Sequence, residues 1–423
     1  DASQPWAATL DPKLIEALRN PPAATGGAPG AHAALAVRRA AEEHALARAF
    51  NSFLTSPAVH VVRELRRREA AVPTVHDFSL ERVLGEGYEG QVLHAVKRES
   101  GVDYALKVLD KRILAKRSRR WRYHVGRERL TLISCHHPFV VSAAYCFQSA
   151  THLFFALEFL PSASLALYIK RHGEHLRTVP VTAIRFVAAE LVLALRHMHS
   201  KEILYRDLKP ANVMLDGDGH VRLVDLGMAT PLERGARRSV CGTQRYMAPE
   251  MRNKVKEGYD SSVDWFALGK LLLDFSGQGH DDEPHYRSGP LVNLVKALLK
   301  PDPKERLGCG PEGPAEIMRH PFFEGVDWGA LERKAMPSPL DPALYSADPN
   351  GLGAFKNGDD LKAMVAKLQR MKRGYRGQDA PAAPDAFGEP PPDLHVEDWD
   401  YVHPEAVYNE FKASPFQQCF MAS

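Results

Sequence analysis

The spacing of hydrophobic residues changes once along the main part of the chain. Beyond Val72, the segments "FSLERVLGEG", "QVLHAVKR" and "DYALKVLD" are short runs rich in strand-forming residues with turn signals between them, and they predict β-strands. From about Thr182 the spacing becomes helical, as in "VTAIRFVAAELVLALRHMH". A small β-rich part followed by a larger helical part predicts an α+β protein with two lobes.

The two ends of the chain lack this regularity. Residues 1–30 are rich in Ala, Pro and Gly, which predicts a flexible segment. Residues 31–75 have a helical pattern that Pro57 interrupts, and regular patterns fade again after Phe323. The predicted parts are therefore 1–30, 31–75, 78–323 and 324–423.

Composition and charge narrow the class of protein. The 423 residues are 44% hydrophobic and 25% charged, which is ordinary for a globular chain. A net charge of +3 is too small to indicate nucleic acid, so we expect none as a partner. The five cysteines are odd in number and never spaced C-x-x-C, which fits a reducing, cytoplasmic compartment better than a disulfide framework or a zinc module. No apolar run is long enough to predict a membrane span.

A glycine-rich stretch lies between the first two predicted strands. In "LGEGYEGQV", Gly85, Gly87 and Gly90 form the pattern G-x-G-x-x-G, and glycine lets a backbone approach phosphates closely. A plain turn or a dinucleotide site has a similar pattern. Because "QVLHAVKR" after the glycines is a predicted strand and not the helix that a dinucleotide site needs, the pattern favours a hairpin that covers phosphates.

Lys107 lies in the apolar run "YALKVLD" of the third predicted strand. A single lysine in such a run more often buries its stem and keeps its charge at the surface. Here Glu128, at the start of a helical pattern, offers a partner that a buried ammonium requires. We therefore predict a Lys107–Glu128 pair that could hold the phosphates of a nucleotide.

Four further polar residues lie between apolar flanks. Asp207, Lys209 and Asn212 are in "ILYRDLKPANVML", and Asp225 follows in "VRLVDLGMA". Phosphoryl transfer needs a carboxylate to receive a hydroxyl proton, a cation near developing negative charge, and oxygen ligands for Mg²⁺. Asp207, Lys209 and the pair Asn212 and Asp225 suit these three roles. Each residue alone would more often be a solvated or capping group, but the four in this order after a Gly-rich loop and a strand lysine indicate phosphoryl transfer.

These segments, taken in order with "YRDLKPAN", "DLG" and "MAPE", resemble a eukaryotic protein kinase, and "LKPAN" resembles the serine/threonine branch. Tyr205 and Leu226 replace the commoner His and Phe, and both replacements are features of the G-protein-coupled receptor kinases within the AGC group. "RLGCGPEGPAEIMRHPFF" and "DPALYSADPNGLGAF" also resemble that group. The resemblance implies a bilobal kinase fold with a β-rich N-lobe and a helical C-lobe. It also implies a partial helical regulator-of-G-protein-signalling homology segment before it and an AGC-type tail after it.

The resemblance also implies functions and partners. It implies a monomeric serine/threonine kinase that uses ATP and Mg²⁺ and phosphorylates activated seven-helix receptors. A general AGC-type kinase with soluble substrates and an inactive kinase-fold scaffold are the alternatives. Glu250 is implied to pair with Arg306, and Asp264 to anchor the catalytic loop. The implied catalytic residues are Asp207, Lys209, Lys107 and Glu128, and the implied metal ligands are Asn212 and Asp225. The implied ATP contacts are Leu84, Gly85, Glu86, Gly87, Gly90, Val92, Ala105, Lys107, Glu158 and Leu160.

Three features depart from the family pattern. "EFLPSASL" has Ser164 where an acidic residue usually contacts the ATP ribose. The segment "LLLDFSGQGHDDEPHYRSGP" is shorter than usual and lacks a helix that helps to dock substrates. The N-terminal homology segment is incomplete. A dead kinase usually loses the lysine or the metal-binding aspartate, and Lys107 and Asp225 are both present.

Several positions suggest regulation. A phosphate on Ser239 could pair with Arg206. In "VEDWDYVHPE", Val396 and Trp399 are the expected apolar anchors of an AGC hydrophobic motif, with Asp400 at its phosphorylated position; a plain surface turn is the alternative.

Two basic runs, at 63–69 and 111–127, predict either a solvated helical face or peripheral contact with the inner face of the plasma membrane. Cys419 is one place too far from the C-terminus for prenylation, and its palmitoylation stays an open alternative.

Overall fold

The computed structural model describes most of one compact unit, Val72–Ser423, and almost none of a second unit, Asp1–Ala71. Several predicted parts lie outside the described residues: segment 1–30, nearly all of 31–75 including the basic run 63–69 except residue 68, Gly87, the middle of the short segment (278–288) and Cys419. The described residues are 68, 71–86, 90–174, 179–232, 239–253, 258–277, 289–346 and 394–413.

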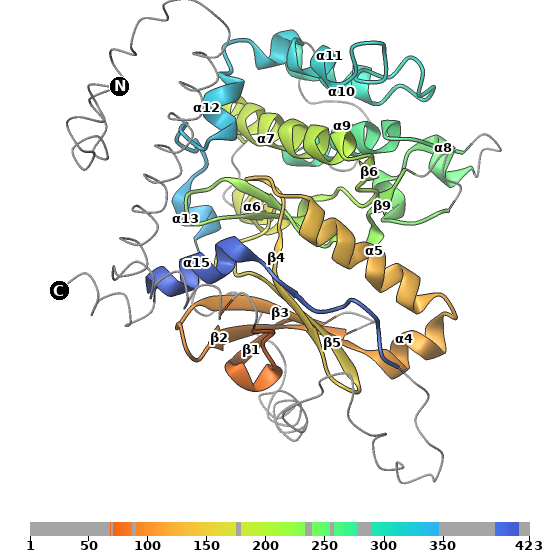
Figure 1. The fold of residues 1–423 in the computed structure, drawn as a ribbon. Coiled ribbons are helices and arrows are strands. Elements are labelled where there is room, and N and C mark those ends of the chain that lie inside the picture. The colour runs from red at the N-terminus through yellow and green to blue at the C-terminus, as the bar shows by residue number, and fades with distance from the viewer. Residues whose placement is uncertain are drawn as a thin grey trace, which may run out of the picture. The chain divides into compact units, whose positions relative to one another are not determined.

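An antiparallel sheet forms the N-lobe (Figure 1). The predicted strands are present, and the strand order is β1-β2-β3-β5-β4-β10. The last strand comes from the C-terminal tail, where Tyr401 pairs with Cys146 of β4. The strands are β1 Phe78–Glu86, β2 Gly90–Lys97, β3 Asp103–Asp110, β4 Ala143–Gln148, β5 His152–Glu158 and β10 Tyr401–Val402.

Alternation along β3 determines which side chains reach the space between the lobes. Tyr104, Leu106 and Val108 are buried on one face of the sheet, whereas Ala105 and Lys107 are half-buried on the other. Successive side chains of a strand point to opposite faces, so the lysine lies outside the apolar core although its neighbours are inside it.

Two helices, α4 (Lys111–Arg117) and α5 (Trp121–Ser134), follow β3 and cross beside the sheet (Figure 1). The Asp110 side chain accepts a hydrogen bond from the Arg112 backbone N–H and caps α4. Trp121, Val125 and Leu132 of α5 are buried at helical spacing, which fixes the rotation of α5 about its axis.

The C-lobe is helical and is built around α7 (Val181–Ser200), whose central residues are almost fully buried. The two-lobed α+β prediction is therefore confirmed.

The other helices of this unit are α6 Leu165–Glu174, α8 Pro249–Arg252, α9 Ser262–Phe275, α10 Pro290–Leu298, α11 Pro314–Met318, α12 Trp328–Glu332, α13 Pro342–Tyr345 and α15 Pro404–Ala413. Its short strands are β6 Ile203–Leu204 with β9 Thr230–Pro231, and β7 Val213–Leu215 with β8 Val221–Leu223. The 3-10 turns are η2 Val75–Asp77, η3 Pro210–Asn212, η4 Leu226–Met228, η5 Gln244–Tyr246 and η6 Pro321–Phe323. Among the residues that the structure describes, no helix has the length and apolarity to cross a membrane.

The C-terminal tail packs onto the N-lobe through Trp399. This side chain is 1% exposed, its indole Nε1 donates to the Phe147 carbonyl at 2.9 Å, and its ring meets Phe155 edge-on. Val396 is also buried, and Arg129 of α5 donates to the Trp399 carbonyl at 2.7 Å. The prediction of two apolar anchors is confirmed, and a plain surface turn is wrong. The Asp400 side chain is exposed.

Helix α15 adds a second, polar attachment of the tail. Glu410 is 1% exposed and accepts hydrogen bonds from Lys97 Nζ at 2.7 Å and from the Tyr104 hydroxyl at 2.5 Å. A buried carboxylate requires such partners. Burial and the adjacent carboxylate raise the pKa of Tyr104 far above its usual range, so the phenol stays a donor.

A buried ion pair joins two distant parts of the C-lobe, as the sequence predicts. Arg306 Nη1 lies 2.6 Å from Glu250 Oε1, and the Arg306 side chain is fully buried. The same guanidinium donates to the carbonyls of Ser262, Lys300 and Pro301. The pair therefore fixes α8 against α9 and the turn after α10.

We predict that Arg306→Met lowers the free energy of unfolding by about 3–5 kcal/mol, because it leaves the Glu250 carboxylate buried without its cation. Urea unfolding checks this. Arg252→Met, on the exposed side of α8, is the matched control with an effect of about 0.5 kcal/mol or less. The double variant Glu250→Leu/Arg306→Met should recover most of the loss, and a single variant as stable as the control would contradict the prediction.

Candidate active site

The predicted pair of Lys107 and Glu128 is present. Lys107 Nζ of β3 donates to Glu128 Oε1 of α5 at 2.5 Å, and Asp225 Oδ1 lies 3.9 Å from the same ammonium. Glu128 is 5% exposed, whereas the Asp225 side chain is 55% exposed. One cation thus lies between a buried carboxylate that holds it and an open carboxylate that faces the space between the lobes.

A strained backbone presents Asp225. This residue has φ 56°, in the left-handed region that a non-glycine residue rarely adopts. Leu226 after it is 1% exposed and anchors η4 in the core, and the Asp225 side chain accepts a weak hydrogen bond from the Gly227 N–H. Packing of Leu226 therefore maintains the conformation that turns the carboxylate outward.

Asp207 is the centre of a dense polar network. Its Oδ2 accepts hydrogen bonds from Lys209 Nζ at 2.7 Å and Asn212 Nδ2 at 2.9 Å. Its Oδ1 accepts from both the backbone N–H and the hydroxyl of Thr243, each at 2.9 Å. The structure therefore brings together the predicted Asp207, Lys209 and Asn212, and adds Thr243, which was not predicted.

The approach of Thr243 to the catalytic loop depends on the glycine before it. Gly242 has φ +94°, and a Cβ there would lie 2.5 Å from the Arg206 carbonyl. Any other residue would push the two loops apart. The spacing of "CGT" before "MAPE" was the available sequence signal for Thr243.

Asp264 holds the backbone of the loop that carries Asp207, as the family resemblance implies. This carboxylate of α9 is fully buried and accepts hydrogen bonds from the backbone N–H groups of Tyr205 at 2.9 Å and Arg206 at 2.7 Å. His199 Nε2 lies 2.9 Å from it as well. Arg206 has φ 70°, so the two amide bonds maintain a left-handed residue directly before Asp207.

Tyr205 links the catalytic loop to the segment of Asp225. Its hydroxyl donates to the Val224 carbonyl at 2.6 Å, immediately before Asp225. Burial, with the nearby Asp225 and Asp207 carboxylates, raises the pKa of Tyr205 well above its ordinary value of 10.0. The residue therefore stays a neutral donor at every physiological pH.

Strands β1 and β2, which carry the glycine-rich stretch, cover one side of the site. Gly85 pairs with Val92, Val92 with Lys107, and Ala105 lies two residues before Lys107, so these positions share one face of the sheet. A Cβ on Gly90 would lie 1.9 Å from the Val108 carbonyl, so glycine is required for the close approach of β2 to β3. Leu84 is half-buried at the same edge, and Glu86 is exposed and accepts a hydrogen bond from Gln91.

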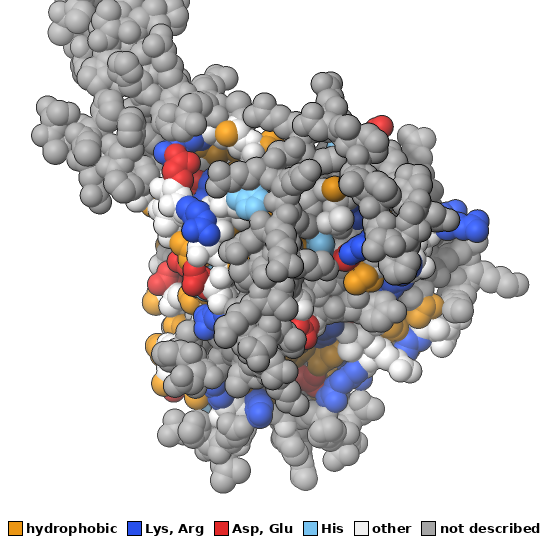
Figure 2. Space-filling model, turned by 90° about the horizontal axis from the view of Figure 1, so that it is seen from below, with side chains coloured by type: hydrophobic (Ala, Val, Ile, Leu, Met, Phe, Trp, Pro, Cys, Tyr) orange, Lys and Arg blue, Asp and Glu red, His pale blue; other side chains and the backbone are white. Residues whose placement is uncertain are grey.

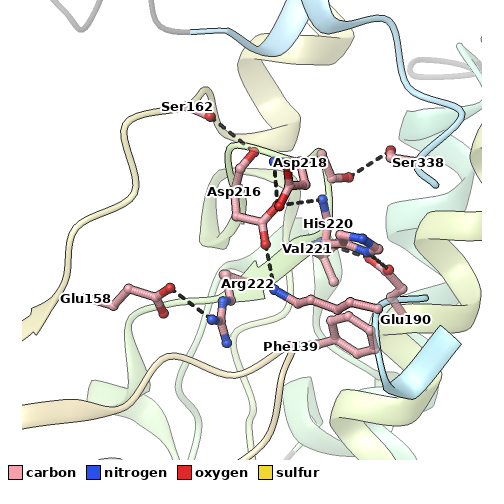
Figure 3. A network of polar contacts seen from close by, with 12 residues as sticks. Phe139, Glu158, Ser162, Glu190, Asp216, Asp218, His220, Val221, Arg222 and Ser338 are labelled. Atoms are coloured by element: carbon pink, nitrogen blue, oxygen red, sulfur yellow. Dashed lines mark hydrogen bonds and ion pairs between the residues drawn. The ribbon is translucent and has the colours of Figure 1, made fainter. Parts of the chain in front are cut away.

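The chain passes from the N-lobe to the C-lobe after β5, and Figure 3 shows polar contacts of this connection. The Glu158 side chain, at the end of β5, accepts from Arg222 of β8 at 2.9 Å and is 38% exposed. Leu160, two residues on, is 9% exposed. Arg222 was missed in the sequence, where an arginine within a short strand carries no distinct signal.

Beside Arg222, further polar groups hold the β7–β8 hairpin (Figure 3). Glu190 of α7 is fully buried, lies 2.5 Å from His220 Nδ1 and accepts from the Val221 N–H at 2.8 Å. Asp216 accepts from Lys334 Nζ at 2.6 Å. The hairpin that follows Asn212 and precedes Asp225 is thus a rigid support for both.

Two other predicted positions have defined surroundings. The Ser164 hydroxyl accepts a hydrogen bond from the Leu167 N–H at 3.3 Å at the start of α6, so this position is uncharged where the family has an acidic residue.

The Ser239 hydroxyl accepts from Arg206 Nη1 at 2.8 Å and lies 3.2 Å from the Tyr259 hydroxyl. Arg206 therefore already contacts the hydroxyl whose phosphorylation the sequence suggested.

The donor atoms suit Mg²⁺. The Asn212 amide nitrogen donates a hydrogen bond to Asp207, so the amide oxygen of Asn212 points away from Asp207. Asp225 offers a half-exposed carboxylate. Mg²⁺ binds few protein oxygens when substrate phosphates and water complete its shell. Within the described ranges no cluster of three or more His, Cys, Asp or Glu residues forms a metal site.

We predict that Tyr205→Phe lowers the free energy of unfolding by about 1–3 kcal/mol, because the Val224 carbonyl loses its buried donor. Because the folded-state pKa of Tyr205 is raised, its contribution to stability is complete below pH 10 and is lost as the pH rises further. Stability measured by urea unfolding should therefore fall less steeply above pH 10 in the variant than in the parent. Equal slopes would show that Tyr205 does not titrate with unfolding.

Comparison with known proteins agrees with this geometry. The model of the protein kinase domain matches residues 78–280. The chain is 36% identical over 324 residues to G protein-coupled receptor kinase 2 of Caenorhabditis elegans, which covers 70% of this chain and 45% of that protein. It is 35% identical over 314 residues to beta-adrenergic receptor kinase 1 of Rattus norvegicus, with 68% and 44% covered. It is 37% identical over 293 residues to human ribosomal protein S6 kinase alpha-2, with 63% and 38% covered.

The chain thus spans less than half the length of these relatives. Residues 78–280 belong to the protein kinase family, in a chain that is similar over 70% of its length to a kinase named for G-protein-coupled receptors.

Proposed function

We propose that this chain is a serine/threonine protein kinase that transfers the γ-phosphoryl group of ATP to a protein hydroxyl. The observation that carries the proposal is that two groups of residues are directly joined, because the Val224 N–H, immediately before Asp225, donates to the Asn212 carbonyl at 3.0 Å. Lys107, held by Glu128, lies 3.9 Å from Asp225, and Asp207 is fixed by Lys209, Asn212 and Thr243.

Each group has a role in the transfer. The Lys107 ammonium binds the α- and β-phosphates, and the open Asp225 carboxylate faces them with Asn212. The bond between the γ-phosphorus and the bridging oxygen of ADP breaks as the substrate oxygen bonds to phosphorus, and Asp207 accepts the hydroxyl proton. Lys209 neutralises the charge that develops on the transferred group. Asn212 and Asp225 would hold Mg²⁺, which would further neutralise the phosphates.

The substrates we propose are activated seven-helix receptors, with the chain acting as a monomer in the cytoplasm and at the inner face of the plasma membrane. Support comes from Tyr205 and Leu226, which are typical of receptor kinases, and from the names of the relatives. A general AGC-type kinase with soluble substrates is the second candidate, supported by similarity to the ribosomal protein S6 kinase. The intact Lys107–Glu128 pair disfavours an inactive scaffold.

We predict that Lys107→Met and Asp207→Asn each lower kcat by about 10²–10⁴-fold while the chain stays folded, because each removes one charge from the reacting groups. Incorporation of labelled phosphate from Mg-ATP into a generic acidic protein measures kcat, and circular dichroism monitors folding. Asp218→Asn, an exposed carboxylate on the β7–β8 turn, is the matched control and should retain full activity. Undiminished transfer by either site variant would refute the assignment of these residues.

We further predict that activated receptor in membranes raises the rate of transfer well above that to a soluble protein. Asp225→Asn supplies the background, because it loses the open carboxylate that faces Lys107. Equal rates with inactive and activated receptor would instead favour a general AGC-type kinase.

A further inference from the structure

One histidine of the sheet contacts the chain that joins the two lobes. His94 lies in the middle of β2, and its ring stacks on the ring of Phe159, with 4.3 Å between the ring centroids and 21° between the ring planes. Phe159 is the residue directly after β5, between Glu158 and Leu160, and the family resemblance implies that both of these contact ATP. The transfer chemistry proposed above uses neither ring.

The register of the sheet places His94 on the face that covers the site. His94 is directly opposite Ala105 of β3, and Val92, two residues before His94, is opposite Lys107. Residues that are directly opposite each other, or two apart in one strand, lie on the same face of a sheet. The strand that begins at Gly90 therefore carries its contact with the connection between the lobes on the same face as Lys107.

A carboxylate orients the His94 ring. His94 Nε2 lies 2.6 Å from Asp103 Oδ1, and because an ionised carboxylate only accepts hydrogen bonds, the imidazole donates from Nε2. Asp103 is opposite Val96, so it lies diagonally across the strand pair from His94 and on the same face. The ring is therefore fixed by a hydrogen bond at its edge and by the stack on its plane.

The residues on either side of Phe159 are held by other parts of the molecule. The Glu158 side chain accepts from Arg222 of β8 at 2.9 Å, and Leu160 is 9% exposed. Three successive side chains thus attach the connection to β8, to β2 and to the interior. Because each residue has only two soft backbone dihedrals, fixing successive side chains also fixes the direction of the carbonyl and amide groups between them.

His94 can be replaced without disturbing the core of the sheet. Its neighbours in β2, Leu93 and Ala95, are fully buried on the opposite face, whereas the His94 side chain is 16% exposed. Figure 2 views the molecule from the end at which Figure 1 places the sheet, and histidine side chains are visible from there. Substitution of His94 therefore tests its contact with Phe159 without opening a cavity in the core.

We propose that His94 is a positioning residue for ATP. By stacking on Phe159, it holds the backbone of Glu158 and Leu160 in a fixed position relative to β2 and β3, the strands that carry Gly90 and Lys107. His94 acts through Phe159 and not by contact with the nucleotide. The inference rests on the kinase function proposed above, and it assigns His94 to nucleotide binding and not to the transfer step.

The test measures kcat and KM for ATP with a generic acidic protein as substrate, and Kd for Mg-ATP by isothermal titration calorimetry. Loss of the ring contact in His94→Ala should raise KM and Kd about fivefold. The value of kcat should change by about twofold or less, because Asp207 and Lys209 are untouched. The matched control His124→Ala removes an exposed histidine of α5 and should have the KM and Kd of the parent.

Two conservative variants separate the stack from the hydrogen bond. His94→Phe keeps a ring on Phe159 and should recover most of the affinity for ATP. His94→Gln keeps a donor for Asp103 without the ring and should resemble His94→Ala. Recovery by His94→Gln but not by His94→Phe would overturn the proposal, because the bond to Asp103 would then be the contact that matters.

A double-variant cycle shows whether the effect passes through Phe159. Phe159→Leu should raise KM by a similar factor, and His94→Ala/Phe159→Leu should be no weaker in ATP binding than the weaker single variant. Factors that multiply in the double variant would contradict the proposal. A fall in kcat as large as the rise in KM would contradict it as well, since a positioning role in nucleotide binding leaves the transfer step intact.

The two readouts distinguish this inference from the proposed function. Binding of Mg-ATP that depends on His94, in a chain that transfers no phosphate, would refute the proposed function alone. Phosphate transfer with the same KM in the parent and in His94→Ala would refute this inference alone. A folded parent that does not bind Mg-ATP would refute both.

Discussion

The buried carboxylate of Asp264 is the contact on which the position of Asp207 depends. It belongs to α9, has no exposure to solvent, and accepts the backbone N–H groups of Tyr205 and Arg206. A carboxylate without water is stable only when donors surround it, so the loop must keep the conformation that supplies them. That conformation includes the left-handed Arg206, directly before Asp207.

The same principle recurs where distant segments meet. Glu250 with Arg306, Glu190 with His220, and Glu410 with Lys97 and Tyr104 are buried charges, each satisfied by a residue far away in the sequence. Such pairs contribute little net stability compared with apolar packing, but breaking one is costly. They therefore act mainly as fixed points that define how helices, loops and the tail are joined around the cleft.

Much of this arrangement could be predicted from the order of residue types. The change from strand to helix spacing predicts the two lobes, and the polar residues between apolar flanks indicate a site for phosphoryl transfer. The Lys107–Glu128 pair followed from the rule that a buried ammonium needs a carboxylate. Thr243, Arg222 and Glu410 were not predicted, because their partners lie 36, 64 and more than 300 residues away, and no local pattern marks such a pair.

The sequence by itself determined which chemistry is available: a strand lysine, a glycine-rich turn, and carboxylates and an amide held between apolar anchors. Only the tertiary structure decided how these groups are used. It placed the Glu158 side chain on Arg222, attached the tail to the sheet through Trp399, and set Thr243 on Asp207. The physical reason is that spacing along a chain fixes the local face of a side chain, whereas its partner depends on packing between elements that are remote in sequence.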